Sequence, residues 1–161
     1  MMCGKICSWK STYAKEIKKE NNAIILSCDD LMLALFDEQL GDMHASMLKK
    51  CQAYLYNLAE QIVATNVNVI LEFGFWNKDE RKDLRELFRL KNITTELHYI
   101  KVDQCSWLAQ IEKRNREVKN GTEKGYYIDE NMKQIFNKAF QPPDKNEIDV
   151  LVENSSASRL S

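Results

Sequence analysis

The chain opens on a run, Gly4-Lys5-Ile6-Cys7-Ser8-Trp9-Lys10-Ser11-Thr12, that matches the pattern G-x-x-x-x-G-K-[ST] at every fixed position except one. Trp9 stands where the pattern has its second glycine. In an intact loop the backbone N–H groups surround the phosphates, the lysine reaches the outer ones, and the Ser/Thr hydroxyl binds Mg²⁺. We therefore predict that residues 4–12 bind a nucleotide phosphate, with Trp9 as the altered position. The alternative is a chance match at an ordinary turn into a helix.

Size and charge limit the classes of protein that this chain can belong to. Its 161 residues suit one domain, and 23 Lys and Arg against 24 Asp and Glu give a net charge of −1. That balance argues against a general nucleic-acid binder. No apolar run reaches the roughly 18 residues of a membrane span, and lysines interrupt any signal-peptide core. The odd number of cysteines, five, indicates reduced thiols and a cytoplasmic protein.

Short apolar runs alternate with amphipathic ones along the chain. This alternation predicts a three-layer α/β fold with a mostly parallel sheet, in one domain over residues 1–153 with a polar tail at 154–161. Only Met1, Met2 and Cys3 precede the glycine-containing loop, so the first strand should be very short. The other expected strands are 23–28, 67–73, 93–102 and 148–152, and the expected helices are 11–20, 42–65, 77–90, 104–119 and 129–140.

Two adjacent carboxylates follow the strand expected at 23–28. Ligands of open parallel sheets bind outside the carboxyl ends of the strands. A carboxylate there can take the proton of a substrate hydroxyl and align it for attack. We assign this role to Asp29 and expect Asp30 to cap a helix that begins at Leu31. The alternative is that both acids serve local structure alone.

Further polar side chains are candidates for metal and phosphate contacts. Glu72 ends the third strand, where an acid would lie near Mg²⁺ or its waters; the alternative is a carboxylate bonded to backbone groups. Arg81, Arg114 and Arg116 carry the forked donors that suit phosphate. Arg114 and Arg116 precede a glycine-containing loop where a lid would hinge, although helix C-termini attract arginine in any case. We favour a functional role for Arg114 and a structural role for Arg116.

The order of these motifs resembles the small P-loop kinases and ATPases of the zeta-toxin and chloramphenicol-phosphotransferase type, often called AAA-domain ATP-binding proteins. The resemblance implies a nucleoside-kinase-like P-loop NTPase fold, binding of ATP and Mg²⁺, and phosphoryl transfer to a hydroxyl of a small molecule. It implies that Lys10 and Ser11 contact the triphosphate and Mg²⁺, that Asp29 is the base, and that Arg114 lies in the lid. The matching stretches are CGKICSWKSTYAKEI, ILSCDDL, VILEFGFWNKDERKDLREL, LHYIKVDQCSWLAQIEKRNREV and FQPPDKNEI.

Two hypotheses of different classes follow. The first is a cytoplasmic small-molecule kinase, favoured by Lys10, Ser11, Asp29 and Arg114. The second is a degenerate, non-catalytic protein of the same fold that binds nucleotide weakly and acts through a protein partner, favoured by Trp9. The near-neutral charge argues against a third reading, a polynucleotide 5′-kinase.

Overall fold

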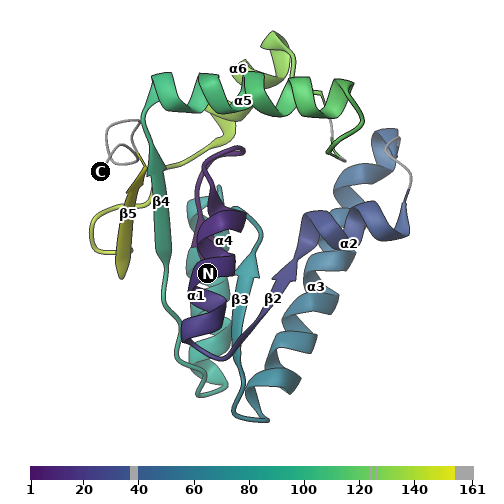
Figure 1. Ribbon diagram of the computed structural model, residues 1–161. Helices are drawn as coiled ribbons and strands as arrows, with labels where there is room; N and C mark the ends of the chain where they lie inside the picture. The colour runs from purple at the N-terminus through teal and green to yellow at the C-terminus, as the bar shows by residue number, and fades with distance from the viewer. Residues whose placement is uncertain (37–39, 124, 126, 155–161) are drawn as a thin grey trace. The chain divides into compact units, whose positions relative to one another are not determined.

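The computed structural model describes residues 1–36, 40–123, 125 and 127–154 (Figure 1). The chain forms two compact units, each with its own parallel strands. The first unit comprises Met1–Lys10 and Gly74–Ser161, and the second comprises Ser11–Phe73. Of the expected polar tail, Asn154 is the last residue of a strand, and residues 155–161 lie outside the described residues.

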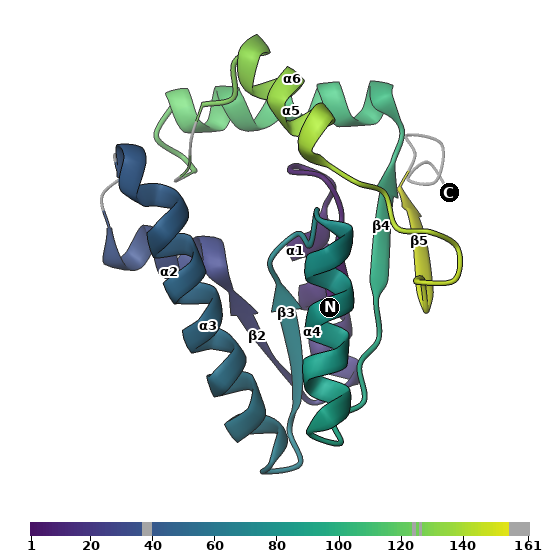
Figure 2. The ribbon, with the colours of Figure 1, turned by 180° about the vertical axis from the view of Figure 1, so that it is seen from behind.

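The second unit is built on a pair of parallel strands, β2 (Ala23–Ser27) and β3 (Asn68–Glu72). Their register runs from Ala23 opposite Asn68 to Ser27 opposite Glu72, so both carboxyl ends lie at the same edge. Helix α3 (His44–Val63) packs along β3 and against α2 (Cys28–Leu35) (Figures 1 and 2). The remaining elements are α1 (Lys10–Glu20), which begins at the last residue of the first unit's N-terminal segment, and the 3₁₀ helix η1 (Gly41–Met43).

The first unit contains a parallel sheet in the order β1-β4-β5. Its strands are β1 (Met2–Cys3), β4 (His98–Val102) and β5 (Val150–Asn154), and its helices are α4 (Lys78–Leu90), α5 (Gln104–Lys119) and α6 (Glu130–Ala139). A core cluster of Trp107, Ile111 and Ile128 joins α5 to the segment before α6. In the part of the chain that is described, no helix has both the length and the apolar character to cross a membrane.

The first strand is as short as the sequence predicts. Two residues of β1 pair with β4, and the backbone N–H of His98 extends the ladder by donating to the Met1 carbonyl at 2.9 Å. A single bridge joins Cys3 to Gly74. The expected strand over 93–102 is wrong in its first half, because β4 begins at His98, opposite Met2. A strand can start only where a partner strand is available.

The start of α2 also differs from the sequence prediction. The helix begins at Cys28 rather than Leu31, and Ser27 caps it: the backbone N–H of Asp30 donates to Ser27 Oγ at 3.1 Å. The expectation that Asp30 is the cap is therefore wrong, because a serine directly at the strand end closes the helix three residues earlier. Asn77 caps α4, since its Oδ1 accepts from the backbone N–H groups of residues 79 and 80.

Ion pairs fasten α4 to the segment that leads into β5. Arg81 pairs with Glu147 at 2.8 Å, and its Nη1 donates to the carbonyls of Phe75 and Gln141 at 3.0 and 2.9 Å. The Arg81 side chain is only 1% exposed. The expectation that Arg81 faces a phosphate is therefore wrong, because its donors bind protein acceptors. Further pairs join Lys78 to Asp144 and Arg85 to Asp149.

Candidate functional site

The loop between β1 and α1, residues 4–9, is anchored at Gly4. The backbone N–H of Gly4 donates to the Gly74 carbonyl at 3.0 Å, and Trp76 Nε1 donates to the Gly4 carbonyl at 2.9 Å. A Cβ at Gly4 would lie 2.7 Å from Ser8 Oγ and 2.8 Å from the Ile100 carbonyl oxygen. The first glycine of the pattern is therefore required by the packing of the loop on itself and on β4.

Trp9 takes the backbone conformation that the pattern normally assigns to glycine. Its φ is +66°, and Cys7 two residues earlier has a φ of +57°. A side chain in this left-handed region costs roughly 1–2 kcal/mol, because Cβ approaches the following carbonyl. The substitution of tryptophan for glycine thus leaves the loop its positive φ and adds backbone strain.

We expect Trp9→Gly to be about 1 kcal/mol more stable to unfolding than Trp9→Ala. Both variants remove the indole, so their difference isolates the strain of a Cβ at positive φ, less the chain entropy that glycine adds to the unfolded state. Urea denaturation of the two variants measures this difference. An alanine variant as stable as the glycine variant would show that the backbone at residue 9 is unstrained.

The loop leads directly into the N-terminus of α1, and helix N-termini favour anions. Lys10 opens the helix, and its Nζ donates to the Lys5 carbonyl at 2.6 Å. The first turn of α1 carries no acidic side chain of its own, and the carboxylate that meets it is Glu72, which accepts from Ser11 Oγ. Ser8 is completely buried, and among the described residues its Oγ has no hydrogen-bond partner. A buried hydroxyl without a partner is costly, and such groups concentrate at functional sites.

Arg114 of α5 reaches the same loop. Its Nη1 lies 4.0 Å from Cys7 Sγ, and its Nε lies 3.9 Å from Glu123 Oε1. Burial raises the pKa of the Cys7 thiol, and the Arg114 guanidinium opposes this rise. Gly125 packs so closely that a Cβ there would lie 2.5 Å from Arg114 Nη2. The structure therefore brings Arg114 and the loop together, and the role of Arg114 at a phosphate stays a prediction.

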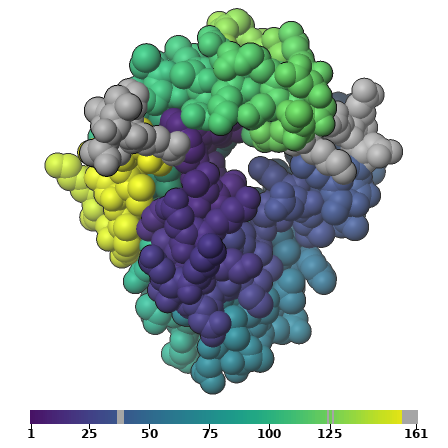
Figure 3. Space-filling view, viewed as in Figure 1, coloured from purple at the N-terminus to yellow at the C-terminus, as the bar shows by residue number. Residues whose placement is uncertain are grey.

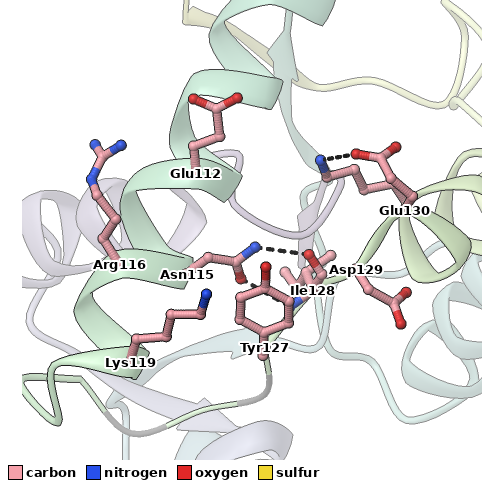
Figure 4. A pocket seen from close by; sticks show the side chains of 9 residues that line it. Glu112, Asn115, Arg116, Lys119, Tyr127, Ile128, Asp129 and Glu130 are labelled. Carbon is pink, nitrogen blue, oxygen red and sulfur yellow. Dashed lines mark hydrogen bonds and ion pairs between the residues drawn. The ribbon is translucent and has the colours of Figure 1, made fainter.

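Arg116 lies on a different face of α5, which is exposed along its length (Figure 3). Two residues along a helix turn by about 200°, so Arg114 and Arg116 point in nearly opposite directions. Arg116 lines a pocket of about 480 Å³ with residues of α5, α6 and the segment before α6 (Figure 4). Asn115 supports this pocket by exchanging two hydrogen bonds with the backbone of Ile128, at 2.8 and 2.9 Å. Arg116 is therefore not at the loop.

The two residues expected at a metal are hydrogen-bonded to each other in the second unit. Ser11 in the first turn of α1 donates through Oγ to Glu72 Oε1 at the end of β3. A hydroxyl and a carboxylate are oxygen donors of the kind that Mg²⁺ takes. Within the described ranges, no group of three or more His, Cys, Asp or Glu side chains could hold a metal by itself. Ser11 and Glu72 thus suit a cation that takes its other ligands from a phosphate and from water.

Asp29 and Asp30 both lie exposed in the first turn of α2, directly after the carboxyl end of β2. Because β2 and β3 end in register, this turn and Glu72 share one edge of the second unit. Acidic side chains also stabilise a helix start by interacting with its positive end. The placement at the strand end is as expected for Asp29, and its role as a base stays a prediction.

Sequence reasoning missed the residues that support the loop from a distance. Trp107 is 1% exposed, and its Nε1 donates to the Ile6 carbonyl at 2.9 Å. Gly74, at a φ of +83°, leaves room for the Trp76 indole that bonds Gly4. The available signal is that a buried tryptophan N–H needs an acceptor, but the sequence does not say which one.

Comparisons with known proteins identify the fold and the family of the chain. The sequence model of a family described as AAA domain matches residues 1–139. A crystal structure of a candidate kinase from Chloroflexus aurantiacus j-10-fl superposes with a TM-score of 0.74 at 14% identity, over 99% of this chain and 89% of that one. A sugar kinase from Janibacter sp. HTCC2649 gives 0.60 at 12% identity, over 94% and 82%. The expected P-loop NTPase fold is thus confirmed.

A chain of the Pnkp1/Rnl/Hen1 RNA repair complex gives a TM-score of 0.62 at 16% identity. The match covers 86% of this chain and 42% of that chain, so the present chain spans less than half of its length. A search of the curated proteins found no match.

Proposed function

Because the chain belongs to this AAA domain family, we propose that it is a kinase that transfers a phosphoryl group from ATP to a hydroxyl of a small molecule. The observation that carries the proposal is the conformation of the loop. Cys7 and Trp9 have positive φ angles, and the Lys10 ammonium donates to the Lys5 carbonyl. We further propose the zeta-toxin and chloramphenicol-phosphotransferase type. The five free thiols suit a reducing compartment, the cytoplasm.

We assign a role to each residue of the site. The backbone N–H groups of residues 5–12 and the Lys10 ammonium bind the phosphates and offset the charge that develops on the transferred group, while Gly4 anchors the loop through its bond to Gly74. Ser11 holds Mg²⁺ directly and Glu72 orients it or its waters. Arg114 contacts the transferred phosphoryl group from the side of α5. Bound Mg-ATP supplies the phosphoryl group and a counter-charge for it.

Asp29 accepts the proton of the attacking hydroxyl. The acceptor oxygen then forms a bond to the terminal phosphorus while the bond from that phosphorus to the bridging oxygen breaks. The net charge of −1 supports a small-molecule acceptor over a polynucleotide, since a polynucleotide site needs an excess of Lys and Arg.

We expect Lys10→Ala to weaken Mg-ATP binding by roughly tenfold or more, because a charge-assisted bond is worth about 1.5–3 kcal/mol. Phosphoryl transfer should fall by roughly 10²–10³-fold, as for other losses of charge stabilisation. Titration calorimetry with Mg-ATP measures the affinity. Transfer of labelled γ-phosphate to a panel of sugars, nucleosides and amino alcohols measures the reaction. Lys15→Ala, an exposed lysine of the same helix, is the control.

Wild-type protein that binds no Mg-ATP would overturn the proposal and leave the non-catalytic hypothesis, in which the strained Trp9 marks a loop that has lost its ligand. Binding without transfer to any hydroxyl compound would also favour that hypothesis. A Lys10→Ala variant with unchanged affinity and rate would remove Lys10 from the site. We expect Trp9→Gly to strengthen binding, because the indole beside the phosphates is removed.

A further inference from the structure

Lys5 is the second residue of the loop. Its side chain extends away from the loop and contacts two helices of the first unit, α5 and α6. Its Nζ donates to Asn137 Oδ1 of α6 at 2.6 Å and lies 4.6 Å from the centroid of the Trp107 ring of α5. The side chain is partly buried, and burial lowers the pKa of its ammonium. A partly desolvated charge needs such contacts to remain in place.

The contact on α5 is fixed. Trp107 is almost completely buried in a cluster with Ile111 and Ile128, and Phe136 of α6 packs against the same cluster. The indole N–H is itself bonded to the loop, at the Ile6 carbonyl. The Lys5 ammonium therefore lies over the Trp107 ring, which is held in the core cluster. Its other partner, Asn137, belongs to α6, which packs against the same cluster through Phe136.

The backbone of the same residue holds the lysine to which we assign the phosphates. The Lys5 carbonyl accepts the hydrogen bond from Lys10 Nζ at 2.6 Å. The direction of the Lys5 carbonyl depends on the orientation of Lys5. The contacts of the Lys5 side chain with α5 and α6 restrict that orientation. Lys5 thus connects α5 and α6, through its side chain, to the Lys10 ammonium, through its carbonyl.

We propose that Lys5 is a positioning residue. Through its contacts with α5 and α6 it determines where the Lys10 ammonium lies. This inference rests on the proposed function, since it gives Lys10 its phosphate-binding role. The side chain of Lys5 acts through Lys10, and it contacts neither the acceptor nor the reacting atoms.

The test uses Lys5→Met, which keeps most of the aliphatic stem and removes the charge and the donor. Asn137→Ala breaks the same bond from an exposed position, where folding is not at risk. Lys5→Arg keeps both the charge over the ring and a donor for Asn137, and Lys138→Met removes an exposed lysine one residue further along α6. Two quantities are measured: the dissociation constant of Mg-ATP by calorimetry, and the rate of acetylation of Lys10 in the nucleotide-free protein by mass spectrometry.

We expect Lys5→Met and Asn137→Ala to weaken Mg-ATP binding roughly three- to tenfold and to raise the acetylation rate of Lys10 by a similar factor. Lys5→Arg should restore both to within about twofold, and Lys138→Met should change neither. In a Lys10→Ala background, Lys5→Met should have no further effect on affinity, because a residue that acts through Lys10 is coupled to it.

Additive losses in the double variant would overturn the inference, since they would mean that Lys5 acts independently of Lys10. Unchanged acetylation of Lys10 in Lys5→Met and Asn137→Ala would overturn it as well. Failure of the proposed function would give a different result. Wild-type protein would then bind no Mg-ATP, while the acetylation rate of Lys10 would still report whether Lys5 positions it.

Discussion

Asp29→Asn is expected to lower phosphoryl transfer by roughly 10²–10⁴-fold while the affinity for Mg-ATP stays nearly constant. Asparagine keeps the shape of the side chain and its place in the first turn of α2, but it cannot accept the proton of the hydroxyl. Transfer rates are compared with the hydroxyl compound that the γ-phosphate panel identifies. Calorimetry with Mg-ATP gives the affinity of the same preparations.

Asp30→Asn is the matched control for this assignment. Both acids lie in the same exposed turn, and Ser27 rather than either of them caps the helix, so neither substitution removes the cap. Similar effects on stability are therefore expected, and only Asp29→Asn should affect the rate. A rate that falls with Asp30→Asn alone would transfer the role of base to Asp30. No loss in either variant would argue against a carboxylate base in this turn.

Arg81→Met is expected to reduce the free energy of unfolding by about 3–5 kcal/mol. The methionine can fill much of the buried space, but Glu147 and the carbonyls of Phe75 and Gln141 lose their donor. Urea denaturation measures the change. Arg89→Met, which breaks the exposed pair of Arg89 with Glu86, is the control and should change the stability far less, because solvent screens an exposed pair.

The same ion pair gives stability a dependence on pH. The hydrogen bonds from Arg81 lower the pKa of the Glu147 carboxyl below its ordinary value. The stabilisation is therefore complete above the ordinary glutamate pKa and is lost as the pH falls through the lowered pKa of the folded state. Arg81→Met should flatten this part of the acid-stability curve. A variant as stable as wild type, with the same acid profile, would show that the pair does not hold α4 to the segment before β5.

The elements that the sequence predicts well are those whose signals are local. Helix α4 has its asparagine cap, and α5 has Asp103, whose carboxylate accepts from the backbone N–H of Ser106. The limits of β4 could not be predicted, because they depend on which residues of β1 and β5 lie opposite. The start of α2 was misplaced because two good capping residues, Ser27 and Asp30, occur within one turn and local propensity does not choose between them.

The candidate site likewise contains some residues that the sequence predicts and others that it does not. The pattern of residues 4–12 predicts the loop, and an arginine before a glycine-containing segment predicts Arg114. The sequence does not predict that Arg81 is buried on Glu147 or that Lys5 spans two helices, because both depend on tertiary contacts between distant segments. The altered position, Trp9, was identified from the pattern, but only the backbone angle shows that tryptophan takes over the conformation of glycine.

The supports of the loop have a consequence for the order in which this protein folds. The loop lies at the start of the chain, yet Trp76, Trp107 and Asn137 contact it from positions 72, 101 and 132 residues further along. Contacts of such long separation form late, because closing a large loop costs entropy before the contact stabilises anything. The loop is therefore among the last parts of the chain to become native. If the loop binds a phosphate as we propose, that binding reports that the first unit has finished folding.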